Sequence, residues 1–368
     1  MAIDLNLEHL PPPPRKKDYR IGAVGAGFIM RDIQLVAYRN AGFQVVAIAS
    51  NDPAEARATA QLRGVPKVYD TARELLADDS IEVLDIAVPP EVQPGIVRAA
   101  LEHQNIRGIL AQKPLARNFR QAQEVVLECE RAGVRLAVNQ NMRYDQSIRA
   151  LKTVLRRGYL GEPVLATIDM RAIPHWQPWA RDYNQVTILF MSIHHLDSFR
   201  FLFGDPESVY ASARPDPRTT FPHQDGVVLY ILEYPNGLRA AAWDDVWTGP
   251  AREGAADDIY IKWRVEGTAG MARGTIGWPG YPARVPSTID FTTLQQPGCW
   301  ISPRWPQVWF PDAFEGTMGE LLSSLAEGRE SVISGRDNLN TIALVEACYR
   351  SLAEHRPVRP AEIKEAQA

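Results

Sequence analysis

Two glycines lie where an apolar run meets a helical pattern near the start of the chain, and this arrangement constrains the fold most. Gly25 and Gly27 follow the strand-like run 21–24, and a second apolar run, 43–49, comes after the helical pattern. Glycines at such a turn let the backbone approach a pyrophosphate, which the first N–H groups of the helix then bind. Met30 replaces the third glycine of the usual fingerprint, so the strand–helix–strand context supports the prediction. An ordinary tight turn is the alternative.

The first part of the chain alternates between strand-like and helical runs. The strand-like runs are 21–24, 43–49, 81–88, 108–111 and 134–138. Such alternation with short connections predicts an α/β Rossmann domain, a doubly wound parallel sheet, over residues 19–145. Residues 1–18 contain four consecutive prolines, which favour an extended N-terminal arm.

The pattern changes after residue 145. The strand-like runs are now 164–171, 227–234, 238–246 and 259–265, and Asn236-Gly237 between two of them is a hairpin signal. We therefore predict an α+β domain with an open, largely antiparallel sheet over residues 146–368, for substrate binding and oligomerisation. Two helical runs, 313–327 and 338–354, lie near its end.

Composition excludes several classes of protein. The 368 residues include 45% hydrophobic and 23% charged residues, and the net charge of −4 gives no reason to expect nucleic acid or an anionic membrane as partner. We find no apolar run of membrane-spanning length and no signal peptide. Three widely spaced cysteines without a CxxC motif favour a reducing compartment, so we expect a cytoplasmic protein.

Polar residues follow two of the predicted parallel strands. Gln112-Lys113-Pro114 comes directly after run 108–111, and Asn141 and Arg143 come shortly after run 134–138. The carboxyl ends of parallel strands form the edge where open α/β sheets bind ligands. A lysine at this edge is a candidate for proton transfer, although a surface lysine on a loop is the alternative.

These motifs together resemble the Gfo/Idh/MocA family of nicotinamide-dependent oxidoreductases. The family's Glu-Lys-Pro motif appears as Gln112-Lys113-Pro114, and its Asn-x-Arg motif appears as Asn141-Met142-Arg143. Its Gly-Thr-x-Gly turn matches residues 267–270, and its Thr-Pro loop appears as Val88-Pro89-Pro90, with Gln93 where a histidine is common. The resemblance implies a dehydrogenase that uses NAD(P) to oxidise a hydroxyl of a sugar (an aldose) or a cyclic polyol.

The resemblance also implies roles for individual residues. Lys113 and His194 would exchange the hydroxyl proton. The residues expected to bind the cofactor are Gly25, Gly27, Phe28, Ile29, Ser50, Asn51, Val88, Pro89, Gln93, Gln112, Lys113 and Asn141.

Two departures from the family pattern remove carboxylates. Phe190 stands four residues before His194, where relatives usually carry an aspartate, and Gln112 replaces the glutamate of Glu-Lys-Pro. Without these charges the pKa values of Lys113 and His194 are expected to be lower than in relatives. The departures keep two other functions open: an NAD-dependent glycoside hydrolase of the same family, and a non-catalytic dinucleotide-binding regulator.

His194 and Asp197 stand three residues apart, so they share a helix face and could pair. His195 points elsewhere, and we expect it in the core. Arg143 and Asp197 are candidates for contacting the substrate, and for Arg143 a structural ion pair to the second domain is an equally good explanation. No metal-ligand spacing is recognisable, and we expect no metal even where His223 and Asp225 lie close in sequence.

The residues after the second strand, Ser50-Asn51-Asp52, bear on the choice of cofactor. Asp52 would repel the 2′-phosphate of NADP, which favours NAD, although the nearby Arg57 leaves NADP possible.

Aromatic residues of the second half are candidates for substrate binding. Alternation along a strand places Trp243, Asp245 and Trp247 on one face, and indole rings beside a carboxylate suit a polyhydroxylated ring. Trp176 offers similar material. The alternative is that these rings cover a sheet face between subunits. All nine tryptophans lie between Trp176 and Trp309, and we expect a homodimer or homotetramer formed through the sheets of this half.

Overall fold

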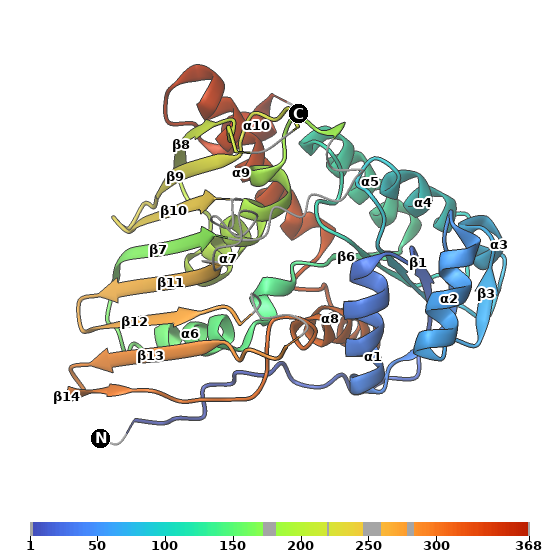
Figure 1. Cartoon of the computed structure of the whole chain (residues 1–368), viewed down its shortest axis with the longest axis horizontal. Coiled ribbons are helices and arrows are strands. Elements are labelled where there is room, and N and C mark those ends of the chain that lie inside the picture. The colour runs from blue at the N-terminus through green and yellow to red at the C-terminus, as the bar shows by residue number, and fades with distance from the viewer. Residues whose placement is uncertain (1–2, 172–181, 219–220, 246–258, 278–282, 367–368) are drawn as a thin grey trace. The chain divides into compact units, whose positions relative to one another are not determined.

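The computed structural model describes residues 3–171, 182–218, 221–245, 259–277 and 283–366 (Figure 1). The chain forms two compact units. One contains Pro11–Asn141 and Phe310–Ile342, and the other contains Met1–Leu10, Met142–Trp309 and Ala343–Ala368. Residues 310–342 thus group with the N-terminal half, although they lie near the end of the sequence. The single division at residue 145 stays a prediction.

The first unit is built on a six-stranded parallel sheet. Its strand order is β3-β2-β1-β4-β5-β6, which is the order of a dinucleotide-binding doubly wound sheet. Every strand pair in it is parallel, as the alternation of runs predicts. The strands are β1 Arg20–Val24, β2 Gln44–Ala49, β3 Lys67–Tyr69, β4 Val83–Ile86, β5 Gly108–Ala111 and β6 Arg135–Val138.

Polar caps and glycines set the ends of the helices between these strands. Asp52 caps the start of α2, and Asn118 caps the start of α5. Gly64 and Gly133 end the same two helices at φ values of 75° and 69°, in the left-handed region that suits glycine. The helical elements are η1 Ile29–Gln34, α1 Leu35–Ala41, α2 Pro53–Arg63, α3 Ala72–Leu76, α4 Gln93–Ala100, α5 Phe119–Ala132 and α8 Ala313–Glu327.

Helix α8 packs on β5 and β6, at one side of this sheet. A side chain at Gly108 of β5 would lie 2.9 Å from Leu325 and 3.2 Å from Leu321, both on α8. Glycine at this position therefore lets the helix approach the strand closely. This contact explains why residues 310–342 belong to the first unit.

The second unit is built on an eight-stranded sheet (Figure 1). Its strand order is β14-β13-β12-β11-β7-β10-β9-β8, and only the pair β7–β10 is parallel. The predicted hairpin at Asn236-Gly237 joins β9 to β10, with Gly237 at φ 88°. The strands are β7 Pro163–Arg171, β8 Ser208–Arg214, β9 Val227–Glu233, β10 Arg239–Asp245, β11 Tyr260–Gly267, β12 Gly270–Thr275, β13 Thr288–Thr293 and β14 Gln296–Ile301.

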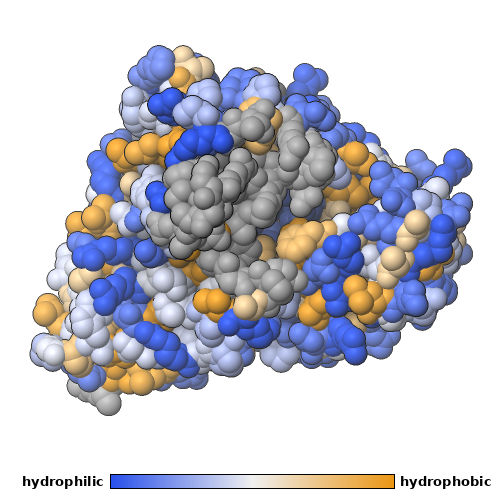
Figure 2. All heavy atoms as spheres, viewed as in Figure 1, coloured by the Kyte–Doolittle hydropathy of each residue, from blue (hydrophilic) through white to orange (hydrophobic). Residues whose placement is uncertain are grey.

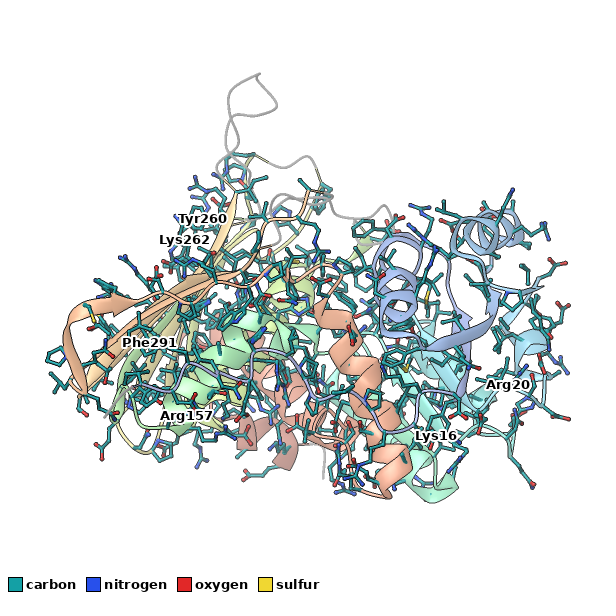
Figure 3. All side chains as sticks on the ribbon, turned by 90° about the horizontal axis from the view of Figure 1, so that it is seen from below. Lys16, Arg20, Arg157, Tyr260, Lys262 and Phe291 are labelled. Atoms are coloured by element: carbon teal, nitrogen blue, oxygen red, sulfur yellow. The ribbon has the colours of Figure 1, made fainter. Side chains whose placement is uncertain are left out.

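The two faces of the eight-stranded sheet differ. Alternate residues are buried along β9, β10 and β11, where helices cover one face. On the other face Lys262 and Tyr260 lie next to each other, with the ammonium group 3.9 Å from the ring centre (Figure 3). The remaining helical elements are η2 Asn141–Tyr144, α6 Gln146–Arg156, η4 Ile188–Ser192, α7 Ile193–Phe203, α9 Gly335–Glu354 and α10 Pro360–Glu365.

Residues 3–19, all of which are described, form no helix or strand. Their first part packs on the second unit, because Leu7 is fully buried and His9 stacks on Trp305 at 4.2 Å between ring centres. Arg157 fixes this segment by donating to the carbonyl oxygens of Asp4 and Asn6.

Candidate active site

The glycine turn after β1 has the geometry that close approach of a ligand requires. Gly25 has φ 101°, and a side chain there would lie 2.3 Å from the carbonyl oxygen of Ala87. Around the side-chain position of Gly27, no heavy atom of the described residues lies within 4 Å. Phe28 and Ile29 then open the helix, with the N–H of Arg31 bonded to the carbonyl of Gly27. The turn therefore fits a dinucleotide pyrophosphate.

The end of β2 is arranged differently from what the sequence suggests. Ser50 is buried, and its hydroxyl accepts from the N–H of Asp52. Asp52 itself accepts from the N–H groups of Ala54 and Glu55, so its carboxylate serves as the cap of α2. Asn51 remains exposed beside Ser50.

Arginines of η1 and α2 are paired with carboxylates. Arg57 lies 2.8 Å from Asp70. Arg31 and Arg63 lie 2.8 Å and 3.0 Å from Asp32, and Arg31 also lies 3.6 Å from Glu55. These guanidinium groups are thus already partly neutralised.

Gln93 holds the loop that carries Lys113. The buried Gln93 amide donates to the carbonyls of Gln112, Pro114 and Leu115 at 2.7, 3.3 and 3.0 Å. Its oxygen accepts from the N–H of Gln112 at 2.7 Å. The carbonyl of Pro89, in the loop that begins at Val88, accepts from the N–H of Gln93 at the start of α4. The hydrogen bonds found for the Gln93 side chain are thus with the Lys113 loop.

Lys113 lies just beyond the C-terminal end of β5 and is partly exposed. Burial lowers the pKa of Lys113 to about 7. An amine with this pKa is present in both the neutral and the protonated form near neutral pH, which suits a group that exchanges protons.

Amide side chains gather after β5 and β6. Asn141 donates to the carbonyl of Asn139 at 3.1 Å. Among the described residues, the amide nitrogens of Gln112 and Asn139 and both amide atoms of Gln140 are buried without a hydrogen-bond partner. Buried polar groups without partners are uncommon and mark places where a bound molecule can supply hydrogen bonds. The position of Asn139, Gln140 and Asn141 directly after a strand predicts amide donors at this edge, although only Asn141 was assigned to the cofactor.

His194 lies in the first turn of α7 and is buried. Its ring meets that of Trp309 edge to face, with centres 5.2 Å apart. Phe190, one turn earlier, packs edge to face on Tyr183, so an aromatic contact takes the place of the family's carboxylate. The sequence did not single out Trp309 as a neighbour of His194.

Asp197 and Arg143 form a buried two-point ion pair. The Nε and Nη2 atoms of Arg143 lie 2.6 and 2.7 Å from the two carboxylate oxygens of Asp197, and these side chains are 7% and 2% exposed. Arg200 lies 3.8 Å from the same carboxylate. The structure thus shows the ion pair that the sequence offered as one explanation of Arg143.

His195 is fully buried, as predicted, beside a carboxylate that the sequence did not single out. Its Nδ1 lies 2.9 Å from Oδ1 of Asp244 on β10. The hydroxyl of Ser192 donates to Oδ2 of Asp244. Strand alternation gives the signal that was missed: Asp244 has the opposite parity to Trp243 and Asp245, so it faces α7.

Trp243 and Asp245 therefore lie on the sheet face opposite α7. Trp243 contacts Tyr260 edge to face, with ring centres 6.1 Å apart. Asp245 lies 2.8 Å from Arg218 and 3.8 Å from Arg171. Trp176 and Trp247 are outside the described residues.

The described residues contain no group of three or more side chains suited to a metal ion. Instead, His223 accepts from the N–H of Asp216, and Asp225 accepts from the N–H groups of Val186 and Ile188. Within the described part of the chain, we also find no helix that could cross a membrane.

The chain matches the two domains of one oxidoreductase family. Residues 19–140 match the model described as "Oxidoreductase family, NAD-binding Rossmann fold". Residues 148–273 match the model described as "GFO/IDH/MocA C-terminal domain".

Similar proteins match over nearly the whole chain. D-apiose dehydrogenase of Paraburkholderia graminis is 29% identical over 358 residues, covering 96% of this chain and 92% of the relative. D-apiose dehydrogenase of Rhizobium rhizogenes is 29% identical over 343 residues, covering 91% and 95%. The crystal structure of an oxidoreductase from Agrobacterium radiobacter, in complex with NAD+, L-tartaric acid and magnesium, matches with a TM-score of 0.80 and 26% identity, covering 94% and 99%.

The predicted resemblance is thereby confirmed, together with the fold class. The chain belongs to the GFO/IDH/MocA family of oxidoreductases and carries the family's NAD-binding Rossmann fold.

Proposed function

We propose that the protein oxidises a CH–OH group of a sugar or cyclic polyol to a carbonyl, with NAD as the oxidant. The position and pKa of Lys113 are the observation that carries the proposal, because oxidising an alcohol requires a group that accepts the hydroxyl proton. The names of the relatives support the substrate class, and D-apiose is the first compound to test.

Lys113 is the proposed proton acceptor. In its neutral form the amine takes the proton of the substrate hydroxyl, and the protonated form returns it in the reverse reaction. When bound, NAD supplies the acceptor for the hydride that leaves the same carbon. His194 is the second candidate for the proton, since a histidine side chain can take up and release one near neutral pH.

We propose that the glycine turn and the strand ends hold the cofactor. The backbone of Gly25, Gly27, Phe28 and Ile29 would bind the pyrophosphate, as the open space at Gly27 suggests. Ser50 and Asn51 would lie near the adenosine ribose. The amides of Gln112 and Asn141, with the loop at Val88 and Pro89, would lie toward the nicotinamide end.

We propose a preference for NAD over NADP. Arg31, Arg57 and Arg63 each pair with a carboxylate, so binding a 2′-phosphate would require these pairs to be broken. We expect a dissociation constant at least about tenfold lower for NAD in calorimetric titrations. Asp32→Asn, which removes the carboxylate that Arg31 and Arg63 share, should narrow the difference between the two dissociation constants. Tighter binding of NADP by the unchanged protein would contradict the proposal.

The function is tested by a screen of D-apiose, other monosaccharides, inositols and sugar acids with NAD and with NADP. We expect one of these sugars or polyols to give reduced nicotinamide, measured by its absorbance. Lys113→Ala serves as the matched control, because it should abolish the signal without loss of cofactor binding. Binding of NAD without turnover of any compound would overturn the proposal.

Two alternatives are distinguished by the same experiments. The loss of two family carboxylates, at Phe190 and Gln112, is the observation that favours a non-catalytic regulator, which would bind NAD and turn nothing over. A glycoside hydrolase of the family would cleave a glycoside without net reduction of NAD. Assays of glycoside cleavage therefore belong in the screen.

We propose that the outward face of the eight-stranded sheet forms a homo-oligomer interface. Tyr210, Leu229 and Ile231 are 41%, 53% and 47% exposed there, and Trp243 is paired in register with Leu229. Hydrophobic and hydrophilic residues are interspersed over the face seen in Figure 2. Light scattering should give a dimer or tetramer of the 41.1 kDa chain, and Leu229→Asp with Ile231→Lys should give monomers. A monomeric unchanged protein would refute the interface.

We further propose a reducing compartment, the cytoplasm, as the location. The three cysteines are free thiols, and Cys129 and Cys348 are buried. Microscopy of a tagged full-length chain tests this placement.

A further inference from the structure

Residues on both sides of His194 in the sequence contact the same buried carboxylate, that of Asp244. Ser192 lies two residues before His194 and donates its hydroxyl to Asp244. His195 follows His194 directly, and its Nδ1 lies 2.9 Å from the other oxygen of Asp244. All three of these contacting side chains are buried.

The surroundings of Asp244 contain several other titratable groups. Tyr230 of β9 and Cys348 of α9 are buried near it, and burial followed by the charge of Asp244 raises the pKa of both. Burial and the same charge also raise the pKa of Asp169 on β7. Tyrosine and cysteine therefore stay protonated. The side chains found in direct contact with the Asp244 carboxylate are those of Ser192, at the end of η4, and His195, in α7.

A buried carboxylate is costly unless donors contact it. The hydroxyl of Ser192, the last residue of η4, donates to one oxygen of Asp244. The imidazole of His195, in the first turn of α7, lies within ion-pair distance of the other oxygen. Within the continuous segment formed by η4 and α7, the backbone groups around His194 bond along the helix, so the contacts with Asp244 are made by side chains. Displacement of this turn would separate Asp244 from both side chains.

We propose that Asp244 is a positioning residue that sets the orientation of His194 through Ser192 and His195. This inference rests on the proposed function, in which His194 exchanges a proton. Asp244 is not proposed to contact the substrate or the cofactor.

The first test measures turnover of Asp244→Asn with the fastest substrate of the screen. We expect kcat to fall by about tenfold to a hundredfold, because small misplacements of reacting groups have effects of this size. The dissociation constant of NAD should stay within about twofold, because the variant leaves the glycine turn intact. A kcat within about twofold of the unchanged protein would overturn the inference.

A double-mutant cycle with His194→Ala separates positioning from general damage. If Asp244 acts through His194, Asp244→Asn should lower kcat no further once His194 has been removed. An equal further loss in that background would overturn the inference. If His194→Ala alone keeps full turnover, the proposed role of His194 fails instead, and the two failures are thereby distinguished.

Asp225→Asn is the matched control for loss of a buried carboxylate. Asp225 accepts from the N–H groups of Val186 and Ile188, at the start of η4, and from the hydroxyl of Tyr349. Among the contacts of the described residues, none joins Asp225 to the turn with Ser192 and His195. We expect this variant to lower the melting temperature with little effect on kcat. If it lowers kcat as much as Asp244→Asn does, the effect is general destabilisation, and the inference is wrong.

Two further readouts apply if Asp244→Asn does not fold. Ser192→Ala should lower kcat, whereas Ser192→Thr, which keeps the hydroxyl, should restore most of it; equal loss in both would contradict the inference. In protein labelled with ¹⁵N-histidine, the His195 signal, assigned with His195→Gln, should report a proton on Nδ1. An unprotonated Nδ1 in the unchanged protein would also contradict the inference.

Discussion

In the unit with the six-stranded sheet, Lys113 is held through the backbone on either side of it, whereas in the unit with the eight-stranded sheet His194 is held through side chains. The neutral amide of Gln93 bonds to the loop around Lys113. The charged group of Asp244 contacts residues on both sides of His194.

The difference follows from the local structure at each position. A loop offers backbone N–H and carbonyl groups that need partners, and an amide can donate and accept at once. A helix has satisfied its own backbone, so only side-chain donors are available, and a carboxylate suits them. The Lys113 loop is therefore held by a neutral amide, without a buried charge. The turn that carries His194 is contacted by a buried carboxylate.

The largest effect is expected from removing Lys113 itself. Lys113→Ala should lower kcat by about a hundredfold or more, the usual range for a proton-transfer group, with NAD affinity nearly intact in calorimetry. In the unchanged protein, oxidation should speed up as the pH rises through about 7, because the neutral amine is the active form. That rise should disappear in Lys113→Ala.

Lys16→Ala, which changes a lysine on the N-terminal segment, is the control for lost positive charge and should leave kcat unchanged. Equal losses of NAD binding and turnover in Lys113→Ala would make Lys113 a residue that positions the cofactor. The comparison between the two units would then no longer concern two proton-transfer groups.

An intermediate effect is expected from Gln93→Leu. This change leaves the N–H of Gln112 and the carbonyl of Leu115 without the Gln93 amide, so the loop should shift. We expect kcat to fall by about tenfold, with a smaller loss for Gln93→His, which keeps ring nitrogens able to bond. Steady-state kinetics are compared with those of Gln121→Leu, an exposed change on α5. An unchanged kcat in Gln93→Leu would show that the hydrogen bonds of Gln93 are not needed to position the Lys113 loop.

The smallest effect on turnover is expected from Asp85→Asn, which tests a buried carboxylate of the first unit. In the described part of the chain, the donors found for the Asp85 carboxylate are the neutral groups of Gln34 and Tyr38, at 2.8 to 2.9 Å. Burial raises the pKa of Asp85 from 3.8 to about 7. Because the folded state binds this proton more tightly than the unfolded state, stability should fall as the pH rises from about 4 to about 7.

In urea unfolding experiments, the free energy of unfolding of Asp85→Asn should not fall in this way between about pH 4 and about pH 7. Relative to the unchanged protein, the variant should gain about 1–2 kcal/mol in free energy of unfolding between pH 5 and pH 7. Asp78→Asn is the control of opposite sign, because the hydrogen bond from Lys67 lowers the pKa of Asp78. If the free energy of unfolding of Asp85→Asn depends on pH as it does in the unchanged protein, Asp85 does not cause the dependence, and its pKa is not raised in the folded state.

Local patterns in the sequence predicted much of the fold. The strand–helix alternation gave the parallel sheet, and Asn236-Gly237 gave the hairpin, because turn chemistry and periodicity act over a few residues. The position of Lys113 after a strand was also predictable. The contacts of Gln93 were not, since a resemblance places a residue in a motif and does not say which groups its side chain reaches.

The sequence by itself determined the family, the glycine turn and the identity of the candidate proton-transfer residues, because these depend on short motifs. Only the tertiary structure decided that Asp52 caps α2, that Asp197 pairs with Arg143, and that Asp244 faces α7 while Trp243 faces away. The packing of α8 on β5 was decided there as well. A carboxylate reads the same in the sequence whether it caps a helix, pairs with an arginine or holds a histidine. Its role depends on which donors the fold brings within hydrogen-bond distance.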